Sequence, residues 1–407
     1  MNTGKPLATG RSIPIGMPTV LRDREPPRWA LWSLGFRPFY LAASVFAALS
    51  VPLWIAQYAG WMPTPYARGP LLHGHEMLFG YTLAVIAGFL FTAVRNWTGR
   101  PTPTGATLAG FVALWCAGRL LVLTPWEGWS AAVNAAFPVA VAIALALPLV
   151  RSGNRRNYFF VALLAGFAAA NVAMQLAHAD LVRFPEQLGL RVALDLVLFV
   201  IAVMGGRVIP MFTNNGVPGT QATRRPAVER MALGSVLALL LVDLVQAPAH
   251  VVAVVSIVAA IAHAARLALW RPWRTWRAPL VWVLHAAYAW IVAFLALRAL
   301  AALDLVALAV ADHALTIGAI GGMTIGMMTR TARGHTGRPL VADACEVACY
   351  ALVQAAAVVR VAGPFVLPGA YVATVVVAGL CWSLAFGLFA VRYWPILSRT
   401  RLDGKPG

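Results

Sequence analysis

Two stretches of the chain, HEMLFGYTLAVIAGFLFTAVRNWTGRP at residues 75–101 and HALTIGAIGGMTIGMMTRTARGHTGRP at residues 313–339, align with each other without a gap. The alignment places His75 on His313, and the tetrapeptide Thr-Gly-Arg-Pro recurs in register near its end. A fainter copy lies at residues 192–218 and has valine where the others have histidine. Internal repeats indicate equivalent structural units. The sequence therefore predicts two histidines at equivalent places on two equivalent helices.

The composition is typical of a membrane protein. Apolar residues make up 60% of the chain and charged residues only 11%, whereas a soluble domain carries about 25% charged residues. Apolar runs of about 20 residues predict membrane-spanning helices. The twelve helices predicted in this way cover residues 36–58, 73–94, 105–124, 129–150, 157–179, 190–212, 229–246, 248–268, 279–301, 305–329, 342–362 and 368–391.

The positive charge of the chain indicates its orientation. The formal net charge is +18, which by itself would also fit a nucleic-acid-binding protein. However, most of the Lys and Arg residues fall in every second loop and in both tails. Cytoplasmic loops of membrane proteins are enriched in these residues. We therefore expect a lipid bilayer, and no nucleic acid, as the partner, with both termini in the cytoplasm.

These features predict an all-α polytopic bundle with short tails. We expect a cytoplasmic N-terminal segment at residues 1–34, a twelve-helix membrane domain at residues 35–392 and a cytoplasmic C-terminal tail at residues 393–407. The three look-alike segments fall in the second, sixth and tenth predicted helices. Because they recur every four helices, the simplest arrangement is three pseudo-equivalent four-helix units around a pseudo-threefold axis.

Ionisable side chains gather near one depth of the predicted bundle. An ionisable group costs at least about 2.5 kcal/mol at the bilayer centre, so such groups usually face the bundle interior and serve a function. The groups expected near the outer side are His73, His75, Glu76, His178, Asp195, Asp312 and His313. This convergence is the main chemical signal in the sequence.

His75 and His313 are the pair that we expect to bind a cofactor. Because the repeat makes them equivalent, they can approach a common centre from two helices. Two imidazoles on opposite sides of one iron form a haem b site, and Asp312 beside His313 is expected to support it as an outer carboxylate. The repeat glycines would leave room for a flat ligand or for a close neighbouring helix. For a single membrane histidine, the alternative is an interhelical hydrogen bond.

His73 is expected to serve a second centre. It lies two residues before His75, and positions i and i+2 of a helix point about 200° apart. A copper ion or a second haem could bind there, with His178 as the partner at the same depth. Glu76 could orient His73 or relay protons, or it could simply be a carboxylate favoured at a helix N-terminus.

The segment that ends the sixth helix, GGRVIPMFTNNG at residues 205–216, is rich in polar and helix-breaking residues. Irregular backbone at membrane depth is tolerated where it is buried in protein or lines a cavity. Arg207 in this segment could pair with a haem propionate. It could equally anchor the helix at the cytoplasmic side.

Several long motifs resemble the NnrS family, and the likeness covers nearly the whole chain. They are GFRPF at 35–39, HGHEMLFGY at 73–81, GFLFTAVRNWTG at 88–99, GGRVIPMFTNN at 205–215 and the segment at 313–339. The resemblance implies a bacterial inner-membrane protein that contains haem and copper. It also implies a role linked to nitric oxide and to denitrification or nitrosative stress.

The resemblance also bears on the histidines. The motif histidines that it carries over are His73, His75, His313 and His335, with His285 in an LHAAY stretch. Any second metal would need His73, His178, His250 or His285. We expect the protein to lower nitrosative stress through redox or gas-binding chemistry at the outer histidines. The alternatives are a transporter of a small solute, which internal repeats also fit, and a factor for metal or haem assembly.

Overall fold

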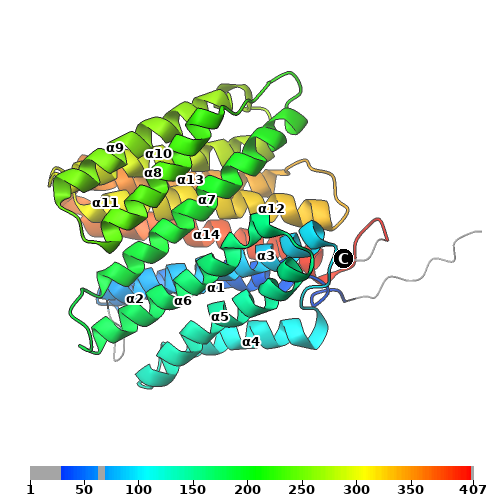
Figure 1. The fold of residues 1–407 in the computed structure, drawn as a ribbon, viewed down its shortest axis with the longest axis horizontal. Coiled ribbons are helices and arrows are strands. Elements are labelled where there is room, and N and C mark those ends of the chain that lie inside the picture. Colours follow the sequence, from blue (N-terminus) through cyan, green and yellow to red (C-terminus); the bar gives the residue numbers. More distant parts are fainter. Residues whose placement is uncertain (1–28, 63–68, 405–407) are drawn as a thin grey trace, which may run out of the picture.

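The computed structural model describes residues 29–62 and 69–404, and this part of the chain is helical (Figure 1). All twelve predicted helices are confirmed. They are α1 (Phe36–Tyr58), α2–η1–α3 (Gly69–His75, Glu76–Thr82, Leu83–Thr98), α4 (Gly105–Leu121), α5 (Glu127–Arg151), α6 (Phe159–His178), α7 (Gln187–Gly216), α8 (Pro226–Leu244), α9 (Ala249–Leu269), α10 (Pro279–Ala302), α11–η4–α12 (Leu308–His313, Ala314–Gly321, Gly322–His335), α13 (Ala344–Val366) and α14 (Tyr371–Ser398). Short 3-10 turns lie at Arg155–Asn157 (η2), Pro272–Arg274 (η3) and Pro368–Ala370 (η5).

The helices form a polytopic membrane bundle. Within the described residues, 10 helices are long and apolar enough to cross a membrane. Helix α4 is apolar but shorter, at 17 residues. Helix α8 has 19 residues and carries Glu229, Arg230 and Asp243 within them. The outward-facing surface is rich in leucine, valine and isoleucine, as lipid contact requires.

The first and third look-alike segments share an unusual backbone. A π-helix follows His75 directly as η1 (Glu76–Thr82), and another follows His313 directly as η4 (Ala314–Gly321). The two π-helices begin at equivalent positions of the repeat. The middle copy lies in α7, which is a continuous α-helix. π-Helical turns are rare in proteins, and those that occur are often found at functional sites. Their recurrence at equivalent positions therefore supports the structural equivalence of the first and third copies.

Repeat glycines in these segments make room for neighbouring side chains. A Cβ atom on Gly318 would lie 2.3 Å from the indole of Trp290. At the equivalent Gly80, it would lie 2.6 Å from the guanidinium of Arg119. The sequence predicts that these glycines leave room either for a flat ligand or for a close neighbouring helix. At both positions the structure shows a closely packed neighbouring side chain.

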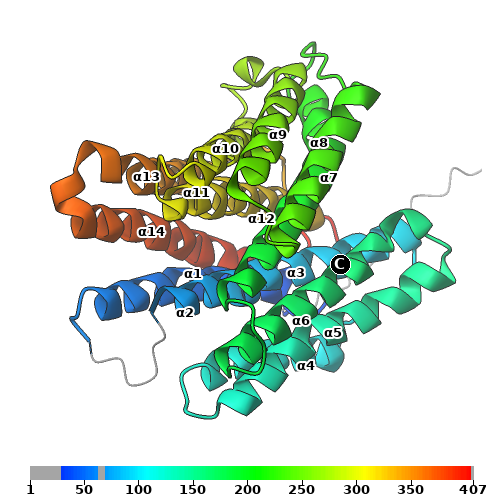
Figure 2. The same ribbon diagram turned by 60° about the vertical axis from the view of Figure 1, so that its left-hand side comes forward.

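The two described ends of the chain lie at the same end of the bundle (Figures 1 and 2). The backbone N–H of Ala30 donates a hydrogen bond of 2.7 Å to the carbonyl oxygen of Ser398. We call this the terminal end, and the opposite end, where α1 finishes and α14 begins, the cavity end. Helix α1 packs between α14 and α3, and α10 packs against α9 and η4.

The predicted tails fall partly outside the described residues. Residues 1–28 of the predicted segment 1–34 and residues 405–407 of the predicted tail are not described. Helix α14 continues to Ser398, beyond the boundary that we expected at residue 392. The arrangement as three four-helix units stays a prediction.

Candidate cofactor cavity

A cavity of about 410 Å³ opens within the cavity end of the bundle. Its walls come from α1, α2 with η1, α7, α11 with η4, α13 and α14, so the first and third repeat copies face it together. Most of the lining side chains are aliphatic or aromatic. The large aromatic ones are Trp54, Tyr58, Tyr81, Tyr371 and Trp382. Such a mostly apolar pocket with a few polar groups is typical of a site for an organic ligand or cofactor.

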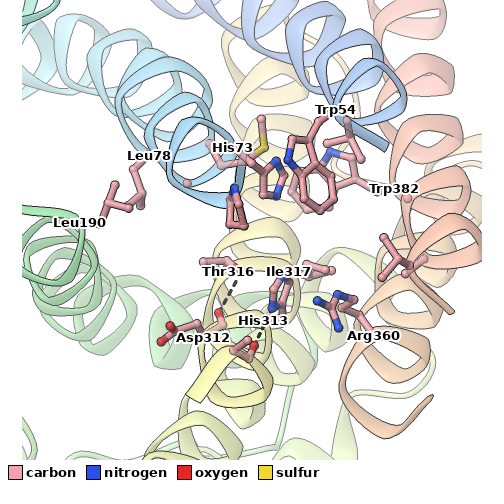
Figure 3. A pocket seen from close by; sticks show the side chains of 18 of the residues that line it. Trp54, His73, Leu78, Leu190, Asp312, His313, Thr316, Ile317, Arg360 and Trp382 are labelled. Atoms are coloured by element: carbon pink, nitrogen blue, oxygen red, sulfur yellow. Dashed lines mark hydrogen bonds between the residues drawn. The ribbon is translucent and has the colours of Figure 1, made fainter. Parts of the chain in front are cut away.

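His73 and His313 line this cavity from different helices. Figure 3 shows His73 on the α2 side and His313 on the α11 side of the same space. The ring of His73 stacks on Trp54, with 4.3 Å between the ring centroids. Both imidazoles thus line the same space.

The tautomer of His313 is set by its own helix. Its Nδ1 lies 2.5 Å from the carbonyl oxygen of Ala309, and a carbonyl can only accept, so Nδ1 carries the proton. The lone pair is then on Nε2. Metal-binding histidines commonly donate the other N–H to a carbonyl or carboxylate in this way. His313 is thus prepared to act as a ligand through Nε2.

Two arginines bring positive charge to the cavity. Arg191 on α7 donates two hydrogen bonds, of 2.7 and 3.0 Å, to the carboxylate of Asp312. Arg360 on α13 donates one of 2.9 Å to the hydroxyl of Tyr371, and Figure 3 shows it beside His313. We did not select either arginine as a site residue from the sequence. The available signal was an arginine within a predicted apolar helix, which is expensive unless it faces the interior.

His75 is not among the residues that line the cavity, so the structure does not bring it to His313 there. Its side chain is 2% exposed. The Nδ1 atom lies 2.8 Å from Glu76 Oε1, and Nε2 lies 3.1 Å from Asn171 Nδ2. Both ring nitrogens thus have protein partners. The prediction that His73 and His75 point to different sides of their helix holds, but His73 rather than His75 joins His313 at the cavity.

Glu76 belongs to the same buried cluster as His75. Its Oε1 also accepts a hydrogen bond of 2.6 Å from Arg119, and Arg119 in turn contacts Asn134. The expectation that Glu76 orients His73 is therefore corrected, because its carboxylate contacts His75 and Arg119. This cluster joins α4, α5 and α6 to the first repeat copy.

The remaining expected site residues lie away from the cavity. His178 pairs with Glu186 at 2.8 Å and is partly exposed, so the structure does not bring it to His73. The Nε2 atom of His285 lies 2.8 Å from Thr213 Oγ1. Arg207 donates a hydrogen bond of 2.9 Å to Asn157. The last two contacts lie towards the terminal end of α7, so the structure does not place Arg207 or His285 beside the cavity histidines.

Among residues 29–62 and 69–404, no group of three or more His, Cys, Asp or Glu side chains is close enough together to hold a metal ion. Axial ligation of a haem iron requires no more than two histidines. The cavity histidines are thus compatible with a cofactor that brings most of the metal's ligands itself.

Comparison with known proteins gives one clear result. The model of the family described as NnrS protein matches residues 30–401. The match includes every helix that lines the cavity. A search of curated proteins found no match to this chain.

Proposed function

The chain belongs to the NnrS family, and from this premise we propose that it is a haem-binding inner-membrane protein that protects against nitric oxide and nitrosative stress. The haem would occupy the cavity, with His73 and His313 as its axial ligands. The observation that carries this proposal is the pair of imidazoles, one just before the first repeat copy and one at the start of the third, that line a single mostly apolar cavity.

The chemistry of the lining residues suits this group. A haem b needs a flat apolar slot, one or two axial ligands and cationic partners for its two propionates. The aromatic side chains of Trp54 and Trp382 supply apolar walls, and Arg360 supplies a cation. Arg191 is already paired with Asp312, so Arg360 is the better propionate partner. The earlier expectation of Arg207 for this role has no support from its position.

The chain's own residues would tune the bound group. The iron of haem b, when bound, supplies one-electron redox chemistry and a site for diatomic gases. The Ala309 carbonyl holds His313 in the tautomer that presents Nε2. The stacking of His73 on Trp54 fixes the orientation of its ring. The apolar walls exclude water, which strengthens electrostatic interactions inside the cavity.

The direct experiment is optical spectroscopy of the purified, reduced protein with and without nitric oxide, together with a pyridine haemochrome and metal assay. We expect about one haem per chain in a low-spin, six-coordinate state. A spectrum that nitric oxide does not change would assign the protein to electron transfer, and a five-coordinate nitrosyl would assign it to gas binding. Protein that contains no haem after expression with ample haem supply contradicts the proposal.

Copper is the second cofactor that the family resemblance implies. We propose it on that resemblance alone and assign it no ligands, since His178 and His285 have their own protein partners. The metal assay on the same sample tests it. A copper-to-chain ratio near zero, with haem present, would leave a haem protein without copper.

The cavity end is proposed to face the periplasm. Among the residues that the structure describes, most Lys and Arg side chains lie at the terminal end, and such residues concentrate on the cytoplasmic side. Reporter fusions at the C-terminus test this orientation. We expect a green fluorescent protein fusion to be fluorescent and an alkaline phosphatase fusion to be inactive, and the opposite pattern contradicts the topology.

The role in cells can be tested separately from the cofactor. We expect a strain without the gene to grow more slowly under nitric oxide donors. The wild-type gene should restore growth, and a His313→Ala gene should not. Equal growth of all strains would contradict the proposed protective role even if the protein holds haem.

A further inference from the structure

A cluster of five charged side chains lies beside the cavity, at the same end of the bundle. Arg191 is bound to Asp312 through both carboxylate oxygens. Arg298 on α10 is bound to both carboxylate oxygens of Asp243 on α8, at 2.5 and 2.7 Å. Asp195 lies on α7 one turn after Arg191 and interacts electrostatically with Arg191, Asp243 and Arg298. Helices α7, α8, α10 and α11 all contribute to this charge cluster.

Asp195 is the member of the cluster without an ion-pair partner of its own. Its side chain is 0% exposed. Neither of its carboxyl oxygens has a hydrogen-bond donor among the described residues. The neighbouring side chain is the carboxylate of Asp243, which is an acceptor. An ionised carboxylate in this position would be buried, unpaired and next to another negative charge, and a group in such a place takes up a proton instead.

The charge balance leads to the same conclusion. With every group ionised, the two arginines do not balance the three aspartates, and the cluster keeps one negative charge inside the membrane. One proton makes it neutral. Asp312 accepts hydrogen bonds from two nitrogens of Arg191, and Asp243 accepts at both oxygens from Nη2 of Arg298. Such charge-assisted bonds favour the ionised form. Asp195 is therefore the group that accepts the proton.

We propose that Asp195 is a proton-binding site that neutralises this charge cluster, and that its proton responds to charge in the adjacent cavity. When protonated, its hydroxyl donates a hydrogen bond to the Asp243 carboxylate. The connection to the cavity runs through the Arg191–Asp312 pair, both members of which line the cavity. A gain of negative charge there favours the protonated form of Asp195, and a gain of positive charge favours its release of the proton.

Infrared spectroscopy of the purified full-length protein tests the site. A protonated carboxylic acid has a C=O stretching band outside the amide region, and this band shifts in D₂O. We expect the wild type to show such a band at neutral pH and Asp195→Asn to lose it. Asp195→Glu should keep a shifted band. Glu186→Gln is the matched control, because this carboxylate lies at the same end but pairs with His178 outside the cluster, and it should leave the band unchanged.

The charge balance also predicts the effect of a second variant, which should increase the number of bound protons rather than remove one. Arg298→Gln removes one positive charge, so the cluster should hold two protons and the band should roughly double, since unpaired buried carboxylates are neutralised. A wild type without the band, or a band that persists at full strength in Asp195→Asn, overturns the proposal. The propionic acids of a bound haem absorb in the same region, but the Asp195→Asn difference spectrum cancels them.

The response to the cavity rests on the proposed function. In reduced-minus-oxidised spectra of the haem-containing protein, we expect a signal in the carboxylic acid band that Asp195→Asn removes. A redox difference spectrum without that signal overturns the coupling but leaves the static site in place. A protein without haem that still loses its band in Asp195→Asn would contradict the proposed function and support the proton site, so the two failures can be told apart.

Discussion

His75 and His313 occupy the same position of one repeat, and a π-helix begins directly after each of them. Their surroundings are nevertheless different. His313 lines the cavity and presents Nε2 because the Ala309 carbonyl accepts from Nδ1. His75 is buried between Glu76 and Asn171. The repeat therefore reproduces the backbone, while the neighbouring helices decide what each histidine does.

The neighbours can be named. On the first copy, α4, α5 and α6 supply Arg119, Asn134 and Asn171, which complete a polar cluster around His75 and Glu76. On the third copy, α13 and α14 leave a cavity beside His313, and α1 supplies Trp54 opposite it. Under the proposed function, His75 would be a structural residue and His313 a cofactor ligand.

Removal of either cavity histidine should have the largest effect. We expect His313→Ala and His73→Ala to weaken haem binding more than about 100-fold, because loss of an axial ligand exceeds the 10–100-fold cost typical of outer residues. The measurement is haem content after purification and washing with a haem-binding competitor. Full haem content in both variants contradicts the assignment.

His75→Ala should have the opposite pattern of effects, with a change in stability but not in haem binding. We expect haem to be retained and the bundle to lose about 1–3 kcal/mol of stability for each buried polar partner left without a hydrogen bond. The partner left in this way is Asn171, since Glu76 keeps its hydrogen bond from Arg119. Thermal unfolding in detergent, followed together with the haem spectrum, separates the two effects. Loss of haem from an otherwise stable His75→Ala protein would restore the pairing expected from the sequence.

The repeat glycines sharpen the comparison at the level of packing. We expect Gly318→Ala to cost about 1–3 kcal/mol, because overpacking at a rigid neighbour strains a packed interior. The added Cβ would lie 2.3 Å from the Trp290 ring. Gly80→Ala should cost less, since its closest contact is the end of the Arg119 side chain. Gly110→Ala, with open space around it, is the neutral control for thermal unfolding, and equal loss in all three contradicts the packing argument.

The smallest effect is expected from the cationic partner. We expect Arg360→Gln to weaken haem retention about tenfold, as loss of an outer-shell contact does, and Arg207→Gln to leave it unchanged. Arg360 lines the cavity, whereas Arg207 contacts Asn157. Competitor titration of both variants measures the difference. A stronger effect in Arg207→Gln would favour the propionate role first expected for that residue.

The fold was largely predictable because apolar runs and loop charges are local signals. Each of the twelve helices could be located from runs of about 20 apolar residues, and the structure confirms them. The π-helices were not predictable, because no composition cue marks them. Each π-helical turn adds about one residue to the helix. Residues that follow His75 and His313 therefore point to a different side of the bundle from the one that regular α-helical spacing predicts.

The candidate site was predictable only in part. Of the ionisable residues expected near one depth, the structure brings His73, Asp312 and His313 to the same cavity. His73 and His75 lie two residues apart on one helix. The rotation of α2 against α1 and α6 decides which of them faces the cavity. That rotation is set by long-range contacts such as Asn171 to His75. Arg360 could not be identified from the sequence either, because its position at the cavity depends on the long-range packing of α13.

Replacement of one axial ligand by another tests the central claim most directly. Electron paramagnetic resonance of oxidised protein distinguishes bis-histidine from histidine–methionine low-spin haem. We predict that wild type and His75→Met both show the bis-histidine signal and that His73→Met shows the histidine–methionine signal. A histidine–methionine signal in His75→Met, with the wild-type signal retained in His73→Met, would contradict the account.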